Sequence, residues 1–235
     1  MSESFKYPGD ELVLFQHATN WKKYFSRAIK PYIKGNVLEV GAGIGSTTLL
    51  LNDGSASQWL MLEPDEKMSA MLEKRIDAKE FPANCRLQTG TIGQLNSTFD
   101  TIIYIDVLEH IENDAEELKK AAALLKTGGH IVVLSPAFDH LYSPFDKAIG
   151  HCRRYNKKML QRITPEGTQL ISNRYYDTVG YFAALMNKLF LRQKYPTLKQ
   201  VKFWDKWMVP VSKIKDNLLF HSFGKSIIAV WKKIN

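Results

Sequence analysis

Cysteine is scarce in this 235-residue chain, which contains only Cys85 and Cys152. Their separation matches no metal-binding spacing, and one pair cannot build the disulfide framework that is typical of small secreted proteins. We expect both residues to be reduced thiols and the protein to be cytoplasmic.

Long apolar runs are also lacking. No uninterrupted hydrophobic stretch approaches the roughly 20 residues that a transmembrane helix requires. The first residues, MSESFKYPGDELVLF, include acidic side chains and lack a signal-peptide pattern. These absences argue against a membrane-spanning or secreted protein. The composition, 45% hydrophobic and 24% charged, is that of an ordinary globular protein.

Acidic residues are few in the last third of the chain. Residues 151–235 contain 17 Lys/Arg and 4 Asp/Glu, whereas residues 1–150 contain 15 Lys/Arg and 20 Asp/Glu. The two parts therefore have net charges of +13 and −5. This asymmetry suggests an anionic partner: a phosphorylated substrate, a lipid surface or nucleic acid. The alternative is a solvated basic face.

Short β-branched runs alternate with helical patterns along most of the chain. We predict strands at 37–40, 58–63, 86–88, 100–105, 130–135, 169–176 and 225–231. We predict helices at 10–33, from 46, and at 65–78, 113–125, 157–164 and 178–215. The glycine pair at 128–129 lies just past the helix at 113–125 and is expected to follow its end.

This alternation favours an α/β fold with helices on both faces of a sheet. We predict a doubly wound, mostly parallel seven-stranded sheet with an antiparallel last strand, in which the last two strands have room to pair antiparallel at one sheet edge. No repeat or low-complexity linker divides the chain, so we expect a single domain over 1–235. A helical cap at about 10–33 and a substrate-side helical insertion at about 178–220 complete it.

A glycine-rich turn follows the first predicted strand, in the segment VLEVGAGIG. Gly41, Gly43 and Gly45 allow a sharp turn and a close approach of backbone to a ligand. Dinucleotide sites usually need G-x-G-x-x-G, whose third glycine would fall at Ser46. Glu39 would repel a pyrophosphate but can hold an amino group. The turn therefore favours S-adenosylmethionine over a dinucleotide, and a purely structural turn is the alternative.

Two more acids stand at the ends of predicted strands. Glu63 ends the second strand, where a carboxylate can accept hydrogen bonds from both ribose hydroxyls. Asp106 and Val107 end the fourth strand, and ligands of open α/β sheets bind outside such strand ends. Glu63 can also be an ordinary helix-capping acid, although Asp65 is suited to that role.

These segments together resemble a known family. VLEVGAGIG, LEPDE, FDTIIYIDVLEHIEND and LLKTGGHIVVLSPA resemble the successive motifs of class I S-adenosylmethionine-dependent methyltransferases. Asn20–Trp21, SPFDKAIGHCRRY and the closing FGKSIIAVWKK extend the resemblance to bacterial type 11/12-like members over almost the whole chain. Such relatives often accompany glycosyltransferases and glycolipid or polysaccharide pathways.

The resemblance implies a role for each cofactor-site residue. The methionine part of the cofactor would lie against Glu39, Gly41, Ala42 and Gly43, and Asp106 and Val107 would line the same part from the fourth strand. The ribose would lie against Glu63 and Pro64, and adenine between Thr91 and Ile92. The family usually has an acid after the third strand to bind the adenine amino group. This chain has Thr89-Gly90-Thr91-Ile92 there, so backbone or the Thr91 hydroxyl would take over that contact.

The loop after the fifth strand contains the candidate catalytic residues. Its polar side chains are His140, Tyr142, Asp146, His151, Arg153, Arg154 and Tyr155. We predict His151 as the base or orienting group, because histidine titrates near neutral pH. Arg153 and Arg154 can grip a phosphate or carboxylate, and Tyr155 completes the predicted catalytic set. The alternative is that HCRRY only packs the loop.

Asp106, Glu109 and His110 form a D-x-x-E-H cluster. A similar E-x-x-E-H cluster binds divalent metal in some ubiquinone-pathway and small-RNA methyltransferases, and carboxylates suit magnesium. Glu109 and His110 can equally cap or orient a helix. From the sequence we expect no metal.

Aromatic and basic residues are mixed in the region from Tyr181 to Phe220. A basic amphipathic helix with tryptophans can lie on a membrane, so peripheral contact with the inner membrane face is one interpretation. An ordinary lid or dimer helix is the other. Nucleic acid ranks lower, because no RNA-binding motif accompanies the charge. The oligomeric state stays open.

The sequence thus predicts a methyltransferase that modifies a hydroxyl of a small, glycan or lipid-linked acceptor. The alternatives are N-methylation of a small molecule, a non-catalytic S-adenosylmethionine-binding protein, and a nicotinamide-dependent oxidoreductase.

Overall fold

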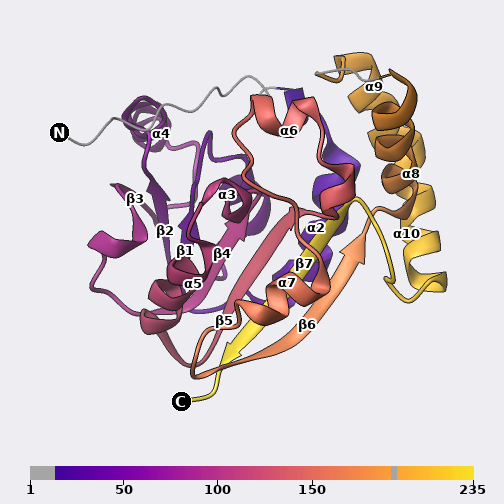
Figure 1. Cartoon of the computed structure of the whole chain (residues 1–235). Helices are drawn as coiled ribbons and strands as arrows, with labels where there is room; N and C mark the ends of the chain where they lie inside the picture. The colour runs from indigo at the N-terminus through magenta and orange to yellow at the C-terminus, as the bar shows by residue number, and fades with distance from the viewer. Residues whose placement is uncertain (1–13, 192–194) are drawn as a thin grey trace.

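A computed structural model describes residues 14–191 and 195–235, and its centre is one seven-stranded sheet (Figure 1). The predicted cap therefore begins outside the described residues, at 10–13. The strands are β1 (Asn36–Val40), β2 (Gln58–Glu63), β3 (Cys85–Thr89), β4 (Phe99–Ile105), β5 (Leu125–Pro136), β6 (Thr168–Tyr176) and β7 (Ser226–Lys233).

The strand order is β3-β2-β1-β4-β5-β7-β6. The first five strands pair in parallel, and β7 is antiparallel to both β5 and β6. This confirms the predicted α/β, mostly parallel sheet with an antiparallel last strand. Because β7 runs the opposite way, its first residue Ser226 pairs with Pro136 and Tyr176, the last residues of β5 and β6.

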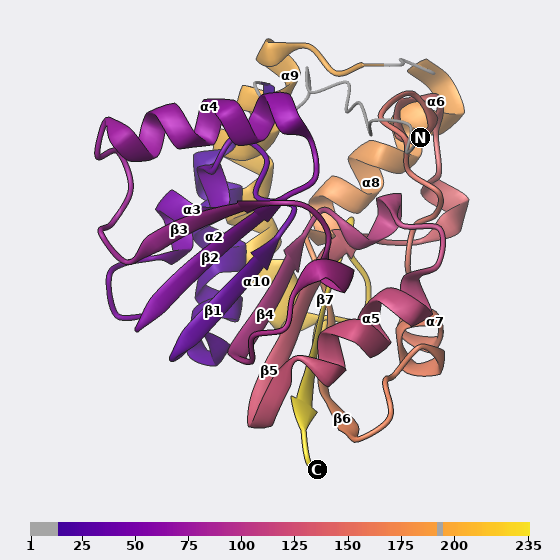
Figure 2. The same ribbon diagram turned by 90° about the vertical axis from the view of Figure 1, so that its left-hand side faces the viewer.

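The helices lie on both faces of the sheet and at one side of it (Figures 1 and 2). They are α2 (Thr19–Ile29), α3 (Ser46–Leu51), α4 (Glu66–Asp77), α5 (Asp114–Ala123), α6 (Pro144–Ala148), α7 (Lys157–Arg162), α8 (Thr178–Met186), α9 (Leu198–Phe203) and α10 (Val209–Leu218). The short turns η1 (Lys30–Tyr32), η2 (Ile92–Gln94), η3 (Leu108–His110) and η4 (Asp139–Leu141) and the π-helical segments η5 (Asn187–Leu191) and η6 (Trp204–Met208) connect them.

Alternating side chains of the strands build two apolar layers. On one face, Trp59 and Ile103 pack in a cluster with Trp21 of α2 and Leu72 of α4. On the other face, Leu38 and Tyr104 belong to a cluster with the buried residues of α5 and α7. Figure 2 shows α5 and α7 on the side of the sheet opposite α2 and α10.

One predicted boundary is wrong. The helix α5 ends at Ala123 and β5 begins at Leu125, so the glycine pair at 128–129 lies inside the strand. Phe99 pairs with Leu125 and the register shifts before Thr101 pairs with His130. Gly128, at φ +77°, accommodates this irregularity instead of stopping the helix.

Helices α8, α9 and α10 form a separate group beside the sheet, at the right of Figure 1. They occupy the predicted substrate-side insertion, and π-helical turns interrupt what the sequence suggested was a regular helical region. None of the helices in the described part of the chain is both long and apolar enough to span a bilayer. Cys85 and Cys152 are free, as expected.

Candidate active site

The glycine-rich turn after β1 sits at the carboxyl edge of the sheet. Gly41, Gly43 and Gly45 have φ values of +70°, +57° and +75°, which favour glycine. The N–H groups of Gly41 and Ala42 both donate to the carbonyl oxygen of Leu62, at 2.8 and 3.1 Å. The turn is therefore fixed to the end of β2.

Gly41 is also a point of close approach. A Cβ added there would lie 2.6 Å from Cγ2 of Val107, which is closer than real Cβ contacts. Val107, just past the end of β4, is thus held against the turn.

Glu63 links the turn to the end of β2. Its Oε2 accepts a hydrogen bond from the N–H of Gly43 at 2.7 Å, and its Oε1 accepts one from Asp65 at 2.9 Å. Burial raises the pKa of Glu63, and the two backbone N–H groups oppose that effect. Asp65 caps α4 through Lys67 and Met68, so Glu63 is not the helix cap. Pro64, between the two acids, is half-buried.

Glu39 lies beneath the turn. It is 2% exposed, and its Oε2 accepts hydrogen bonds from Thr48 (2.5 Å) and from the indole of Trp59 (2.7 Å). Burial raises its pKa to about 7. Glu39 supports the turn from below, and its direct contact with a methionine amino group stays a prediction.

The two predicted adenine neighbours differ in exposure. Thr91 is exposed and its N–H donates to Gln94 at 2.7 Å, whereas Ile92 is 2% exposed and packs in the core. The N–H of Gly90 donates to the carbonyl of Glu63 at 3.0 Å, which holds this segment beside the second strand. Thr91 is the more accessible of the two to a ligand.

Asp106 has an unusual backbone for its position. Its φ is +54°, which is uncommon for a residue other than glycine, and its N–H donates to Leu134 at 2.8 Å. The side chain is open to solvent, but protein surrounds it on most sides and raises its pKa to about 6, against the opposing charges of His151 and Lys225. Strained residues of this kind often occur at functional sites.

His151 is held by an acid on the same loop. Its Nδ1 lies 2.9 Å from Oδ1 of Asp146, and its side chain is 7% exposed. Asp146 is fully buried and also accepts from Ser143 and, through both oxygens, from Arg154. Hydrogen bonds from His151 and the charge of Arg154 hold the pKa of Asp146 below its usual range. Arg154 is thus an internal partner of Asp146.

Arg153 and Tyr155 fasten the loop to the start of α5. Arg153 pairs with Asp114 at 2.6 Å and donates to the carbonyl of Glu112 at 2.8 Å. Tyr155 is fully buried, and its hydroxyl donates to Asp114 at 2.8 Å. Both therefore have a structural task, while a catalytic role for either stays a prediction.

Lys225 is a site residue that the sequence reasoning missed. Its ammonium group lies 3.8 Å from the ring centre of Trp204, and it interacts electrostatically with Asp106, Asp146 and Asp177. Burial lowers its pKa. An antiparallel last strand starts at the end of the sheet where the parallel strands finish. The predicted topology therefore indicated that residues just before this strand lie near the site.

The residues that meet around Glu109 and His110 are not the three that the D-x-x-E-H motif predicts. Ligand atoms of Glu109, His110 and His151 lie within 4.8 Å of one another. Burial and the neighbouring His151 lower the pKa of His110 to about 4. The cluster therefore takes its third member from the loop after β5 in place of Asp106.

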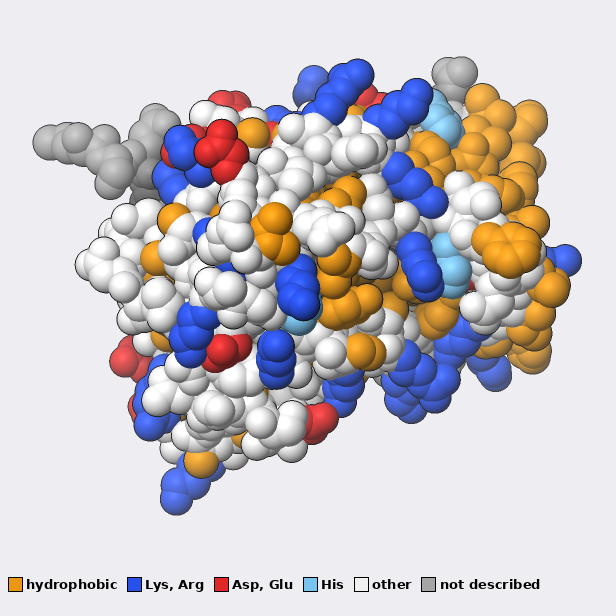
Figure 3. Space-filling view, turned by 90° about the horizontal axis from the view of Figure 1, so that it is seen from below, with side chains coloured by type: hydrophobic (Ala, Val, Ile, Leu, Met, Phe, Trp, Pro, Cys, Tyr) orange, Lys and Arg blue, Asp and Glu red, His pale blue; other side chains and the backbone are white. Residues whose placement is uncertain are grey.

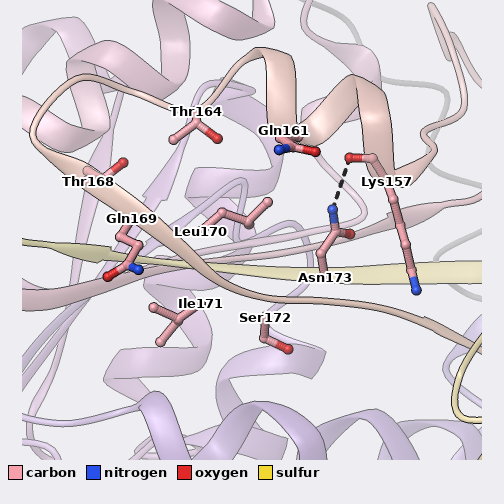
Figure 4. Close-up of a pocket in the computed structure, with 9 residues that line it drawn as sticks. All are labelled: Lys157, Gln161, Thr164, Thr168, Gln169, Leu170, Ile171, Ser172 and Asn173. Atoms are coloured by element: carbon pink, nitrogen blue, oxygen red, sulfur yellow. Dashed lines mark hydrogen bonds between the residues drawn. The ribbon is translucent and has the colours of Figure 1, made fainter.

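A separate open groove of about 650 Å³ lies between α7 and the edge strand β6 (Figure 4). Its lining side chains are mostly neutral, and the amide of Asn173 donates to the carbonyl of Lys157 at 3.0 Å. The groove contains neither the glycine turn nor the acids at the strand ends. It is not the site assembled above.

Comparisons with known proteins agree with this geometry. A family model described as "Methyltransferase domain" matches residues 15–174. The chain is similar to a structure of the complex between the Haloferax volcanii Trm112 methyltransferase activator and a methyltransferase, with a TM-score of 0.66, 13% identity and coverage of 99% and 100% of the two chains.

Two further structures have the same fold. An S-adenosylmethionine-dependent methyltransferase from Clostridium acetobutylicum gives a TM-score of 0.58, 12% identity and coverage of 93% and 92%. The N-methyltransferase NodS from Bradyrhizobium japonicum gives 0.58, 13%, 93% and 97%. With the family match, the chain belongs to the methyltransferase domain family and is a class I S-adenosylmethionine-dependent methyltransferase.

Proposed function

We propose that the enzyme methylates a hydroxyl group on a small, glycan or lipid-linked acceptor. The pairing of His151 with the buried Asp146 at the carboxyl edge of the sheet carries this proposal. A hydroxyl is a poor nucleophile at neutral pH and needs a proton acceptor, whereas an uncharged amine already offers a lone pair.

The described residues fit the methyl donor. The turn at Gly41 and Gly43 brings bare backbone to the site; Glu63, bonded to the N–H of Gly43, would bind the ribose, and Asp106 would face the methionine part. Adenine would lie against Thr91. When bound, S-adenosylmethionine supplies an electrophilic methyl group on a positively charged sulfur.

His151 is suited to accept the proton of the hydroxyl. Asp146 accepts a hydrogen bond from the Nδ1–H of His151, so Nε2 is the nitrogen left to act as a base. With the donor bound, the acceptor oxygen would bond to its methyl carbon, sulfur would leave with the electron pair of the carbon–sulfur bond, and the hydroxyl proton would pass to Nε2 of His151.

Lys225 extends the acceptor side of the site. Its partly desolvated ammonium group, held against Trp204, can attract an anionic group of the acceptor such as a phosphate or carboxylate. Arg154 is committed to Asp146 and is less free for this role. A charged acceptor matches the basic C-terminal third.

A screen with labelled methyl donor tests the proposed reaction. Free saccharides, lipid-linked saccharides and small amines are offered to the enzyme, and label in an ether is expected. His151→Gln should lower turnover by about 10²–10⁴-fold and leave donor affinity nearly unchanged; the exposed His17→Gln is the control. Label only in amines would support N-methylation, and donor binding without transfer to any acceptor would support a non-catalytic binding protein.

We further propose that the α8–α10 group rests on an anionic membrane surface. Along α9, η6 and α10 an exposed apolar stripe recurs at three- and four-residue intervals: Phe203, Trp207, Val211, Ile214 and Leu218, which are 45–66% exposed. Phe182, Met186 and Phe190 of α8 and η5 add to it, at 51%, 53% and 70%. Figure 3 shows hydrophobic side chains gathered at this side of the molecule.

The charges around this stripe are of one sign. Lys199, Lys202, Lys206 and Lys215 are exposed. In contrast, Asp177, Asp205 and Asp216, three of the four acids after residue 150, are buried. The group therefore presents apolar and cationic side chains together, which suits the interface of an anionic bilayer.

Vesicle sedimentation tests this contact. The protein should bind vesicles of phosphatidylglycerol and phosphatidylcholine, bind pure phosphatidylcholine less, and weaken with added salt. Trp207→Ser with Ile214→Ser should reduce binding, while Leu49→Ser with Met71→Ser, which removes comparably exposed apolar groups from α3 and α4, should not. A monodisperse protein that binds neither kind of vesicle would contradict the proposal. The exposed apolar face of α8–α10 would then be assigned to a protein partner, such as an activator subunit.

A further inference from the structure

Glu109 is a buried carboxylate with one unused oxygen. The residue is 0% exposed, and its Oε2 accepts a hydrogen bond from Ser135 at 2.9 Å. Its Oε1 is buried and has no hydrogen-bond donor among the described residues. A carboxylate oxygen in this situation is costly unless a donor or a cation satisfies it.

The unused oxygen points toward His151. The distance from Oε1 of Glu109 to Nε2 of His151 is 3.8 Å, too long for a hydrogen bond. Asp146 occupies Nδ1 of the same ring, which directs Nε2 toward Glu109. A carboxylate on one ring nitrogen is the usual support of a histidine whose other nitrogen binds a metal.

His110 brings a second imidazole to the same place. Its ring meets that of His151 edge to face, with 4.6 Å between the ring centres. One ligand atom each from Glu109, His110 and His151 lies within 4.8 Å of the other two. The typical distance from such a ligand atom to a bound cation is about 2 Å. Small movements of the three side chains are enough to bring their ligand atoms to that distance from one cation.

We propose that Glu109, His110 and His151 bind one divalent first-row transition-metal cation at the acceptor side of the active site. Two imidazoles and one carboxylate favour Mn²⁺, Co²⁺ or Zn²⁺ over Ca²⁺ or Mg²⁺, which prefer oxygen ligands. Three protein ligands leave coordination positions open for an acceptor. This departs from the metal-free expectation, because the sequence spacing does not reveal that His151 meets Glu109.

The proposal deepens the proposed function, on which its catalytic meaning rests. With a cation at Nε2, His151 would act on the acceptor through the metal and not by direct proton transfer: the cation would hold an acceptor oxygen near Asp106 and lower the pKa of its hydroxyl, so that the proton leaves to solvent. Loss of His151 would still lower turnover. Acceptors with two neighbouring oxygens, such as a sugar diol or a hydroxyl beside a carboxylate, suit the open positions.

The competing arrangement has no metal. His151 would then lie between Asp146, at 2.9 Å, and Glu109, at 3.8 Å, with no cation bound. The two arrangements differ in a direct measurement, since only the first gives stoichiometric cation binding in the absence of donor and acceptor.

The test uses the full chain, stripped with chelator and dialysed against Mn²⁺, Co²⁺, Zn²⁺ or Mg²⁺. About one equivalent of a transition metal should remain bound, with a visible spectrum of nitrogen-coordinated Co²⁺. Glu109→Gln and His110→Asn should each bind at least about tenfold more weakly, because each removes one of three ligands. His17→Asn and Glu112→Gln, exposed residues outside the cluster, should bind as the parent does.

Circular dichroism and thermal unfolding establish that each variant is folded. If Glu109→Gln does not fold, His110→Asn, at a half-buried position, still tests the proposal. A folded parent that retains no transition metal, or variants that bind as well as the parent, would overturn the inference. Because binding is read without turnover, this failure is separate from failure of the methyl-transfer proposal, which the labelled-donor screen reports.

Discussion

Gly41 shows how a single hydrogen atom in place of a side chain shapes the site. Gly41→Ala should destabilise the fold by about 1–3 kcal/mol and weaken donor binding at least about tenfold, equivalent to ~1.4 kcal/mol. Its Cβ would meet Val107 at 2.6 Å, at a φ of +70°. Urea unfolding and calorimetry with S-adenosylmethionine measure the two effects.

Gly54→Ala is the matched control for this substitution. Gly54 has a φ of +87°, but a Cβ there would meet nothing within 4 Å. The control shares the backbone cost without the contact, so donor affinity should not change. Equal losses of affinity in both variants would contradict the role of the close approach.

Glu39 gives the protein a specific dependence on pH. Its folded pKa, about 7, is above its ordinary value of 4.5. Folding therefore favours the neutral acid, and this stability is full below pH 4.5 and is lost as the pH rises through 7. Glu39→Gln cannot ionise, so its free energy of unfolding relative to the parent should rise by about 3 kcal/mol between pH 4.5 and 8.

Urea unfolding of both proteins at several pH values measures this difference. Glu73→Gln, exposed on α4, is the control and should follow the parent at every pH. A parallel course of parent and Glu39→Gln would mean that Glu39 is ionised throughout.

Sequence motifs identified the residues whose roles depend on local backbone. The turn at Gly41, the acid Glu63 and the strand-end Asp106 were found because each follows directly from a strand. Long-range pairings were not visible. That Arg153 binds Asp114 and that Glu109 faces His151 depends on how the loop after β5 folds back over η3 and the start of α5.

At the scale of elements, α2 depends on an acid from a distant helix. Its N-cap position, Ala18, has no capping side chain. Instead, Asp205 of η6 accepts hydrogen bonds from the N–H groups of Asn20 (3.0 Å) and Trp21 (2.8 Å). The sequence around α2 contains no signal for this contact, because the partner lies more than 180 residues away.

Asp205→Ala should therefore destabilise the fold by about 1–3 kcal/mol, since it leaves the buried N–H of Trp21 and the half-buried N–H of Asn20 without this acceptor. Asp53→Ala removes an acid whose exposed pair with Lys30 spans 3.2 Å, and its effect should stay below about 1 kcal/mol. Urea unfolding compares the two. Similar losses would mean that Asp205 contributes no more than a surface pair.

Strand positions were predicted well because buried parallel strands are short apolar runs between turns. The exceptions are instructive. The sequence predicts the end of a helix before the glycine pair at 128–129, because glycines are typical there, whereas the structure has this pair in the irregular first half of β5. The π-helical segment η6 contains Trp204, whose indole donates to the buried Asp177 at 2.7 Å, and local propensity does not encode so distant a contact.

At the scale of the whole molecule, ligand preference separates the methyltransferase from the oxidoreductase alternative. S-Adenosylmethionine at about 100 times its dissociation constant should add ~2.7 kcal/mol of stability, or about 5–10 °C in Tm for a chain of this size. NAD at the same concentration should leave Tm unchanged, because the turn has Ser46 where the third glycine of the dinucleotide motif would stand. Stabilisation by NAD would contradict this account of the site.

The position of β7 between β5 and β6 has a consequence for the order of assembly. Within the described residues β6 pairs only with β7, which comes more than 40 residues later in the chain, after the α8–α10 group. A chain emerging from the ribosome can thus build the five-stranded parallel portion early, while β6 stays without a neighbour until β7 has been made. The glycine turn and the acids at the strand ends can form in the first stage, whereas the surroundings of Lys225 form only in the second.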